Sequence, residues 1–284
     1  MLINSQEKLD LLCAKLEQEK TIALDTEFVR RTTYYAKLSL IQIAESTGNI
    51  SIIDVNNLDL TPFKNLLLNE KVLKILHAAL QDFENFYNLF KAMPVNVFDT
   101  QIAARFCGFR RATSYAELCK EIARSEIDKT YQAADWLARP VSNEMLAYAA
   151  KDVEHLHEIY HHLSEKISDK EQYNDALNKE LLDPNLYKLR PERAWKKVKS
   201  NQQHRYDYDA MRALAAFREE CAASLDIPRG FFITDDDLVR ICRFLPTSVA
   251  ELSIHKQKTN WITTDKYRNK LLDLCAALKD SLVD

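Results

Sequence analysis

Apolar, strand-like runs alternate with helical patterns in the first third of the chain. Three consecutive runs predict β-strands: TIALDTEFV (21–29), KLSLIQIAE (37–45) and NISIIDV (49–55). Two further runs predict strands on either side of a helix with an aromatic face: KVLKILHAA (71–79) and VNVFDT (95–100). Three strands followed by strand–helix alternation indicate a mixed α/β sheet with helices packed on it.

Helical patterns lie between and after these strands. The stretch DLTPFKNLLL (59–68) predicts a helix in which Thr61 caps the N-terminus and Pro62 takes the first position. From residue 101 to about 165 the pattern predicts helix throughout. No G-x-G-x-x-G opens any helix, so a dinucleotide-binding fold is not expected.

The later part of the chain predicts a second, entirely helical unit that begins near Tyr206, with Thr234 capping one of its helices. We expect three regions: the α/β domain at 1–168, a helical and basic linker at 169–204, and the helical domain at 205–284. A length of 284 residues fits one large domain and one small domain.

Composition narrows the class of protein. No stretch reaches about 18 uncharged apolar residues, so we expect no membrane span. The six cysteines are scattered, without a C-x-x-C pair, which favours a reduced, cytoplasmic protein. The net charge of −3 argues against nucleic-acid binding, but residues 188–205 hold seven Lys or Arg against one acid. Lys196, Lys197 and Lys199, beside Trp195, are therefore candidate phosphate-binding residues, with a solvated linker as an equal alternative.

Two acidic residues lie two apart in the first long strand. Asp25 and Glu27 follow the apolar run of residues 22–24, and strand geometry places both side chains on one face. Carboxylates that converge in a buried strand are costly unless cations neutralise them. A divalent metal with oxygen ligands meets that need. A D-x-E sequence also occurs by chance at strand ends, so the pair alone does not decide.

Three further residues complete a candidate constellation. Asp82 follows the fourth strand at the start of a helix, where an acid can simply complement the helix dipole. Tyr148 and Asp152 are four apart in a helix and share one face, where a structural hydrogen bond is the alternative to catalysis. Taken together in this order, the four acids suit two Mg²⁺ or Mn²⁺ ions and in-line attack on a phosphodiester.

At this point the chain resembles a known family. Three segments are similar to the exonuclease motifs of the DEDD superfamily, and the tyrosine four residues before the last Asp is typical of its DEDDy branch: ALDTEF (23–28), LHAALQDFE (76–84) and YAAKDVEHL (148–156). Longer segments around these motifs, including VFDTQIAARFCG and DWLARPVSNEMLAYAAKDVEHL, resemble the ribonuclease D family, and the C-terminal 80 residues resemble an HRDC domain. Such enzymes commonly carry two helical domains in tandem, where these 80 residues hold one.

The resemblance implies a ribonuclease H-like mixed sheet flanked by helices, followed by a small all-α HRDC-like domain. It implies a hydrolase, a 3′→5′ exoribonuclease that uses two ions to release nucleoside 5′-monophosphates and that matures tRNA 3′ ends. The implied partner is RNA with a free 3′ end, such as a tRNA precursor, and the implied state is a monomer without a membrane.

The resemblance also implies a role for each site residue. Asp25 bridges both ions, Glu27 and Asp152 complete the site of the ion that activates water, and Asp82 supports the second ion through its waters. Tyr148 positions the attacking water, and Glu27 or its backbone touches the terminal 3′ hydroxyl.

The role of Phe28 is open from sequence alone, because it either stacks on the last bases of RNA or is a core aromatic residue. Two rival functions also stay open. A DNA 3′→5′ exonuclease shares the metal chemistry, and a catalytically inactive RNA-binding scaffold shares the fold. The presence of all four carboxylates and the tyrosine argues against the inactive scaffold.

Overall fold

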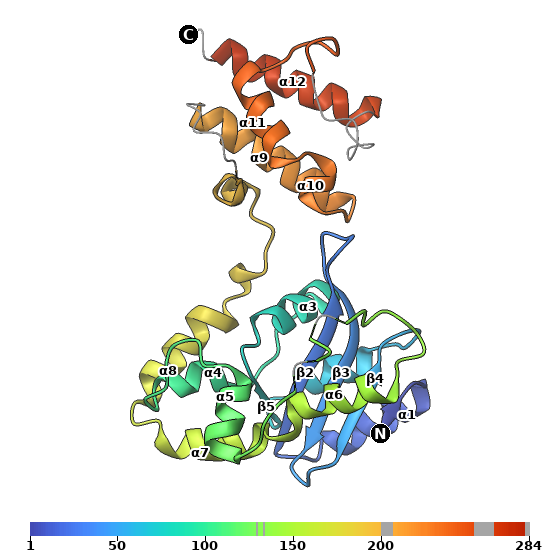
Figure 1. Ribbon diagram of the computed structural model, residues 1–284, viewed down its shortest axis with the longest axis vertical. Coiled ribbons are helices and arrows are strands. Elements are labelled where there is room, and N and C mark those ends of the chain that lie inside the picture. Colours follow the sequence, from blue (N-terminus) through green and yellow to red (C-terminus); the bar gives the residue numbers. More distant parts are fainter. Residues whose placement is uncertain (129, 133, 200–206, 253–263, 282–284) are drawn as a thin grey trace. The chain divides into compact units, whose positions relative to one another are not determined.

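The computed structural model describes residues 1–128, 130–132, 134–199, 207–252 and 264–281 (Figure 1). The chain divides into two compact units. The first holds Met1–Val29 and Ala36–Lys188, and the second holds Arg30–Tyr35 and Leu189–Asp284. Within the described residues, no helix is long and apolar enough to cross a membrane.

The first unit is built on a sheet of six strands in the described part of the chain, in the order β1-β4-β3-β2-β5-β6. The central strands β2, β3 and β4 pair antiparallel, whereas β2, β5 and β6 run parallel, as β1 does to β4. The strands are β1 (Leu2–Ile3), β2 (Thr21–Val29), β3 (Lys37–Glu45), β4 (Ile50–Asp54), β5 (Leu73–Leu76) and β6 (Val97–Asp99). The predicted mixed sheet is confirmed, and β1 is an additional strand.

Helices cover both faces of this sheet (Figure 1). On one face, Ile22 and Leu24 of β2 share a core with Leu9, Phe63 and Phe83 from three helices. These helices are α1 (Gln6–Leu16), α2 (Thr61–Leu67) and α3 (Leu80–Phe90). Aliphatic and aromatic residues at helical spacing thus meet the apolar positions that alternate along the strand.

The opposite face carries α6 (Asn143–Glu154), which lies across β2, β3 and β4, and α7 (Leu156–Lys166), which packs on β5 and β2. Ala23 and Ala44 on the strands meet Val153 and Leu156 there. Small residues under the helices let them approach the sheet closely. The remaining helical segments of this unit are α4 (Thr100–Arg105), α5 (Tyr115–Leu118), α8 (Lys170–Leu177), the π-helical turns η1 (Cys119–Ala123) and η2 (Asn178–Leu182), and the 3-10 turn η3 (Pro184–Leu186).

Side-chain caps fix where several of these helices begin. Ser142 accepts a hydrogen bond from the Met145 backbone and caps α6. The predicted cap of α2 is wrong: Leu60 is the N-cap, and Thr61 is the first helical residue. Asp59 decides this, because its carboxylate accepts hydrogen bonds from both the backbone and the hydroxyl of Thr61.

The prediction of continuous helix from 101 to 165 is also wrong. Helix η1 ends where Arg124 takes a left-handed conformation, and the next helix starts only at Asn143. The described residues between them are turns and irregular chain. This segment also makes contacts with β3 and β4, because Arg139 pairs with Asp54 and Ser39 donates to the Trp136 carbonyl. Helical periodicity cannot reveal such contacts.

The second unit is helical, as predicted. It contains the 3-10 segment η4 (Pro191–Lys197) and the helices α9 (Tyr208–Ser224), α10 (Arg229–Phe232), α11 (Asp235–Phe244) and α12 (Asp265–Ser281). A separate core joins them, with Met211, Leu238 and Leu271 fully buried. Thr234 caps α11 as expected, because its hydroxyl accepts from the Asp237 backbone.

Candidate active site

The first pair of candidate ligands lies on β2 beneath α6. Asp25 and Glu27 are both partly exposed, in a strand whose neighbouring Leu24 is fully buried. Their positions at i and i+2 place both side chains on one face of the sheet. In the antiparallel register with β3, Asp25 lies opposite Gln42, and the register shifts just after Glu27. The shift, a bulge-type irregularity, bends the strand next to the second carboxylate.

Asp82 comes from the first turn of α3 and is buried. The Thr26 hydroxyl donates a hydrogen bond to its carboxylate. Thr26 lies between the two β2 acids and points to the other face of the sheet from them. The bond therefore links the Asp82 side chain directly to the strand that carries Asp25 and Glu27.

The last two candidates share one face of α6. Tyr148 precedes Asp152 by one helical turn, so their side chains are neighbours. The buried Ala149 and Val153, on the adjacent stripe, hold the helix against the sheet. Its C-terminal end is fixed by Tyr115, whose hydroxyl donates to the Lys151 carbonyl at 2.9 Å and accepts from the His155 backbone at 3.1 Å.

The charges of neighbouring acids act on the two carboxylates of β2. Burial raises the pKa of Asp25 well above its usual value, and the charges of Asp82, Asp152 and Glu27 raise it further. Burial, with Asp152 and Asp82, raises the pKa of Glu27 to about 9. Burial also raises the pKa of Asp82 and that of Asp152 to about 7. The charges of Glu27 on β2, Asp82 on α3 and Asp152 on α6 thus all act on Asp25.

Three of these carboxylates also act on the phenol of Tyr148. Burial raises its pKa to about 12, and the carboxylates of Asp152, Glu27 and Asp25 add to the shift. Two aromatic rings from the preceding loop contact its ring. The centroid of Tyr131 lies 5.8 Å away in an edge-on arrangement, and that of Trp136 lies 6.0 Å away.

The donor set suits a hard divalent cation, because it consists of carboxylates that repel one another. In the described part of the chain, no group of three His, Cys, Asp or Glu side chains has the spacing of a formed metal site. One buried polar group supports the fit. Gln42 is fully buried opposite Asp25, and neither its amide nitrogen nor its amide oxygen has a hydrogen-bond partner among the described residues. A hydrated cation beside Asp25 would satisfy both.

The remaining candidate residues are Phe28 and three lysines. Phe28 is partly exposed on β2, just past the register shift, so its stacking role stays a prediction. Lys196 and Lys197 lie in η4 and Lys199 follows it, all three exposed in the second unit. The structure therefore brings the four acids and Tyr148 into one region of the first unit and places the lysines in the other unit.

Comparison with known proteins decides the family. A family model described as a 3′-5′ exonuclease matches residues 1–168, and an HRDC-domain model matches residues 208–275. The ribonuclease D of Acidiphilium cryptum is 33% identical over 98% of this chain and 72% of its own length. This chain belongs to the ribonuclease D family. The predicted ribonuclease D-type exoribonuclease, a hydrolase, is thereby confirmed at the level of the family.

Other members of the ribonuclease D family agree with this assignment. The ribonuclease D of Bartonella henselae is 34% identical over 92% of this chain, which spans 65% of that protein. The crystal structure of Escherichia coli RNase D, described as an exoribonuclease involved in structured RNA processing, matches with a TM-score of 0.84. That match is 30% identical and covers 98% of this chain and 75% of that one. The chain thus spans about two thirds to three quarters of the length of these relatives.

Ribonuclease D belongs to a class of exonucleases that depends on divalent metal. A structure of Brucella melitensis NrnC described as having bound Mg²⁺ shares the fold, with a TM-score of 0.56 and 22% identity over 72% of this chain and 97% of that chain.

Sequence reasoning missed three residues that support the site: Thr26, Gln42 and Tyr115. Thr26 lies inside the DTE motif, and its position between two acids was the available signal. The others act through strand register and helix packing, which the local sequence does not show.

Proposed function

We propose that this chain is a 3′→5′ exoribonuclease that hydrolyses the terminal phosphodiester of RNA with two Mg²⁺ or Mn²⁺ ions and releases nucleoside 5′-monophosphates. The observation that carries this proposal is the set of four carboxylates on β2, α3 and α6, with Thr26 of β2 hydrogen-bonded to Asp82. Asp82, Asp152 and Glu27 all raise the pKa of Asp25, so the four lie within range of one another. When bound, two such ions supply stabilisation of charge at the attacking and leaving oxygens of the phosphodiester.

We assign the metal-binding roles to Asp25, Glu27, Asp82 and Asp152. Asp25 has the central position, because each of the other three acts on it. In the absence of cations, Glu27 keeps its proton at neutral pH because its pKa is raised to about 9, and Asp82 and Asp152 keep theirs in part because their pKa values are raised to about 7. Ion binding therefore displaces protons and draws the side chains together.

We assign the orientation of the attacking water to Tyr148. With its pKa raised to about 12, the phenol keeps its proton at neutral pH and acts as a hydrogen-bonding group rather than as a base. Glu27, on the same face of β2 as Asp25, contacts the terminal 3′ hydroxyl through its side chain or backbone. That contact accounts for attack from an end.

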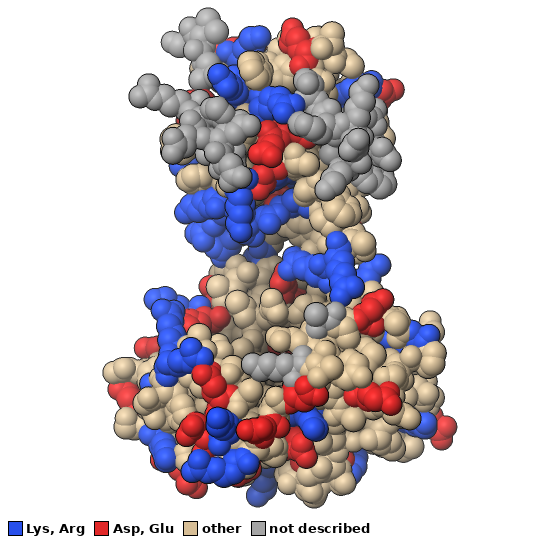
Figure 2. All heavy atoms as spheres, in the orientation of Figure 1, with Lys and Arg blue, Asp and Glu red and all other residues tan. Residues whose placement is uncertain are grey.

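We assign substrate capture to the basic segment. Lys196, Lys197 and Lys199 are exposed, and Lys196 and Arg212 lie over the ring of Trp195, at 5.8 Å and 5.2 Å from its centroid. On the face that Figure 2 shows, Lys and Arg side chains gather in one part of this unit. Positive charge beside an aromatic ring suits an RNA backbone.

The wider biological assignment also belongs to the proposal. The description of the Escherichia coli relative supports structured RNA as the substrate, and we propose tRNA precursors with 3′ extensions. We further propose a cytoplasmic monomer with the exonuclease domain at 1–168, the basic linker at 169–204 and the HRDC-like domain at 205–284. Phe28 is assigned to stacking on the terminal bases.

The proposal is tested with a 5′-labelled, single-stranded RNA incubated with Mg²⁺ or Mn²⁺. We expect a ladder that shortens from the 3′ end, and no ladder with EDTA or with Asp25→Asn. Asp10→Asn, an exposed acid on α1, is the matched control and should leave the ladder unchanged. A DNA strand of the same sequence tests for a DNA exonuclease. Intact RNA that still shifts on a native gel with both metals would instead identify a binding scaffold.

A further inference from the structure

The loop before α6 carries two rings that contact Tyr148. Tyr131 meets the Tyr148 ring edge-on, with centroids 5.8 Å apart and planes at 66°. Trp136 lies 6.0 Å away with planes at 37°, and it is 2% exposed. The buried Trp136 ring therefore packs against the ring of Tyr148, which is itself only partly buried. The direction of the Tyr148 hydroxyl depends on the position of the Trp136 ring.

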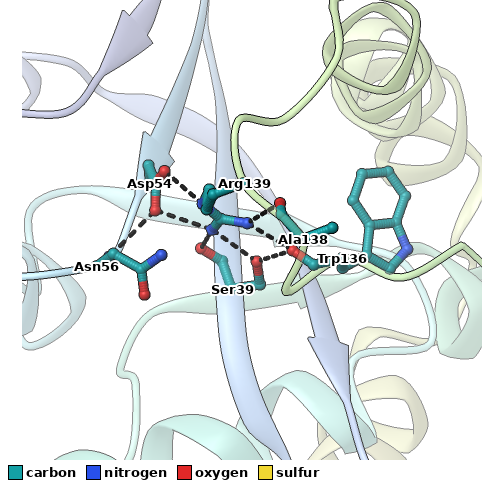
Figure 3. A network of polar contacts seen from close by, with 6 residues as sticks. All are labelled: Ser39, Asp54, Asn56, Trp136, Ala138 and Arg139. Atoms are coloured by element: carbon teal, nitrogen blue, oxygen red, sulfur yellow. Dashed lines mark hydrogen bonds and ion pairs between the residues drawn. The ribbon is translucent and has the colours of Figure 1, made fainter.

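Arg139 holds the backbone of Trp136 in place (Figure 3). Its Nε donates to Asp54 Oδ2 at 2.7 Å, and its Nη2 donates to Asp54 Oδ1 at 2.9 Å. Its Nη1 donates to the Trp136 carbonyl at 2.7 Å. The same carbonyl accepts from Ser39 Oγ at 2.5 Å, and Ser39 Oγ accepts from Arg139 Nη2 at 2.9 Å. One guanidinium thus joins β3 and β4 to the backbone of Trp136.

The geometry of this network fixes the position of the loop on β4. Arg139 and Asp54 form a bidentate pair, and their side chains are only 23% and 15% exposed. Two parallel charge-assisted bonds fix orientation as well as distance, which a single point charge does not. In this partly buried setting, loss of one partner leaves the other charge poorly compensated. The loop would then lose its fixed position against β4.

We propose that Arg139, held by Asp54, is a positioning residue for the nuclease reaction. It fixes Trp136 against the ring of Tyr148 and thereby sets the direction of the Tyr148 hydroxyl. This inference rests on the role proposed above for Tyr148. The polar partners of Arg139 among the described residues are Asp54, Ser39 and the backbone of Trp136 and Ala138, so we expect its effect on the reaction to pass through Trp136.

The test is a double-mutant cycle. Arg139→Met keeps the apolar stem of the side chain and removes the guanidinium. We expect it to lower kcat by roughly 10- to 100-fold, the range for groups that orient catalytic side chains, with KM for RNA unchanged. In a Tyr148→Phe background the same change should cost less than about twofold, because no hydroxyl remains to be positioned. Equal losses in both backgrounds would overturn the proposal.

Further variants guard against a loss of folding. Asp54→Asn keeps the shape of the acceptor and should reproduce the fall in kcat, whereas Arg139→Lys should restore part of it. Glu180→Gln is the matched control, because it breaks another partly buried pair in the same unit, Arg105–Glu180 at 3.0 Å. It should leave kcat unchanged. A melting curve establishes that each variant is folded at the assay temperature.

The outcomes separate this inference from the proposed function. Full activity of Asp25→Asn would defeat the proposed function itself. If Asp25→Asn is inactive but Tyr148→Phe is as active as the wild type, the two-metal site stands and the positioning role of Arg139 is overturned. A fall in kcat for Arg139→Met that disappears in the Tyr148→Phe background is the supporting result.

Discussion

The Thr26 hydroxyl donates a hydrogen bond to the Asp82 carboxylate and so joins β2 to the first turn of α3. The bond matters because Asp82 is buried and its charge raises the pKa of Asp25. A carboxylate that must share a cation has to be held at the right distance from its partners. Thr26 does this from the strand that carries two of them.

Thr26→Val should weaken divalent metal binding. Valine keeps the shape and the strand preference of threonine but removes the donor to Asp82. We expect the metal concentration for half-maximal activity to rise by roughly 10- to 100-fold, the usual effect of losing a group that orients a ligand. Activity at saturating metal should recover in large part.

Thr61→Val is the control for this substitution. It removes a hydroxyl that donates to Asp59 at 2.6 Å on the exposed side of α2. Its metal requirement should match the wild type. An unchanged metal requirement in Thr26→Val would mean that Asp82 needs no support from the strand.

The stability of the metal-free protein should fall as pH rises. Burial and neighbouring acids raise the pKa of Glu27 to about 9, and burial raises that of Asp82 and of Asp152 to about 7. The ordinary pKa of such groups is about 4. A carboxyl group with a raised folded-state pKa stabilises the fold below the unfolded pKa, and this stabilisation is lost as pH rises through the folded pKa. The affected window is therefore about pH 4 to 9.

Thermal melts in EDTA across this window test the expectation. Tm should decrease with pH, and added Mg²⁺ or Mn²⁺ should raise Tm most at the alkaline end, where the ligands lose protons most readily. Asp25→Asn should flatten both trends, because it removes one of the repelling charges. A metal effect on Tm that is the same at all pH values would contradict this reading.

The sequence predicted the central part of the sheet and the constellation of acids, because both depend on local patterns. Short apolar runs mark β2 and β3, and the D-x-E spacing puts Asp25 and Glu27 on one face whatever the surroundings. The strand β1 escaped prediction because two residues, Leu2 and Ile3, are too few to show a period. Its strand character comes from pairing with β4.

Two supporting residues, Gln42 and Arg139, could not be predicted, because their partners are distant in the chain. Gln42 lies opposite Asp25 only through the β2–β3 register. Arg139 meets Asp54 across 85 residues of chain, within a region whose local pattern reads as helix. Where tertiary hydrogen bonds replace the helical ladder, periodicity misleads, and this happened in the loop that contacts Tyr148.

Tyr148→Phe should lower kcat by about 10²-fold or more, the range for a positioned group that orients or transfers a proton. KM for RNA and the metal requirement should change little, because the ring stays packed against Trp136 and the carboxylates are untouched. Single-turnover rates at saturating metal provide the measurement. Tyr131→Phe is the control, since it keeps the ring contact and removes a different hydroxyl.

The triple variant Lys196→Ala, Lys197→Ala, Lys199→Ala should weaken RNA binding without changing kcat. The three ammonium groups are exposed near Trp195 and far along the chain from the carboxylates. Each contact with a single-stranded phosphate contributes about 0.7 to the slope of log K against log salt. We therefore expect a shallower salt dependence and a raised KM, measured by titration of RNA at several salt concentrations.

Replacing the exposed Lys8, Lys20 and Lys71 removes the same net charge from the first unit and should leave the slope unchanged. Equal effects of the two triple variants would show that net charge, rather than this segment, governs RNA capture.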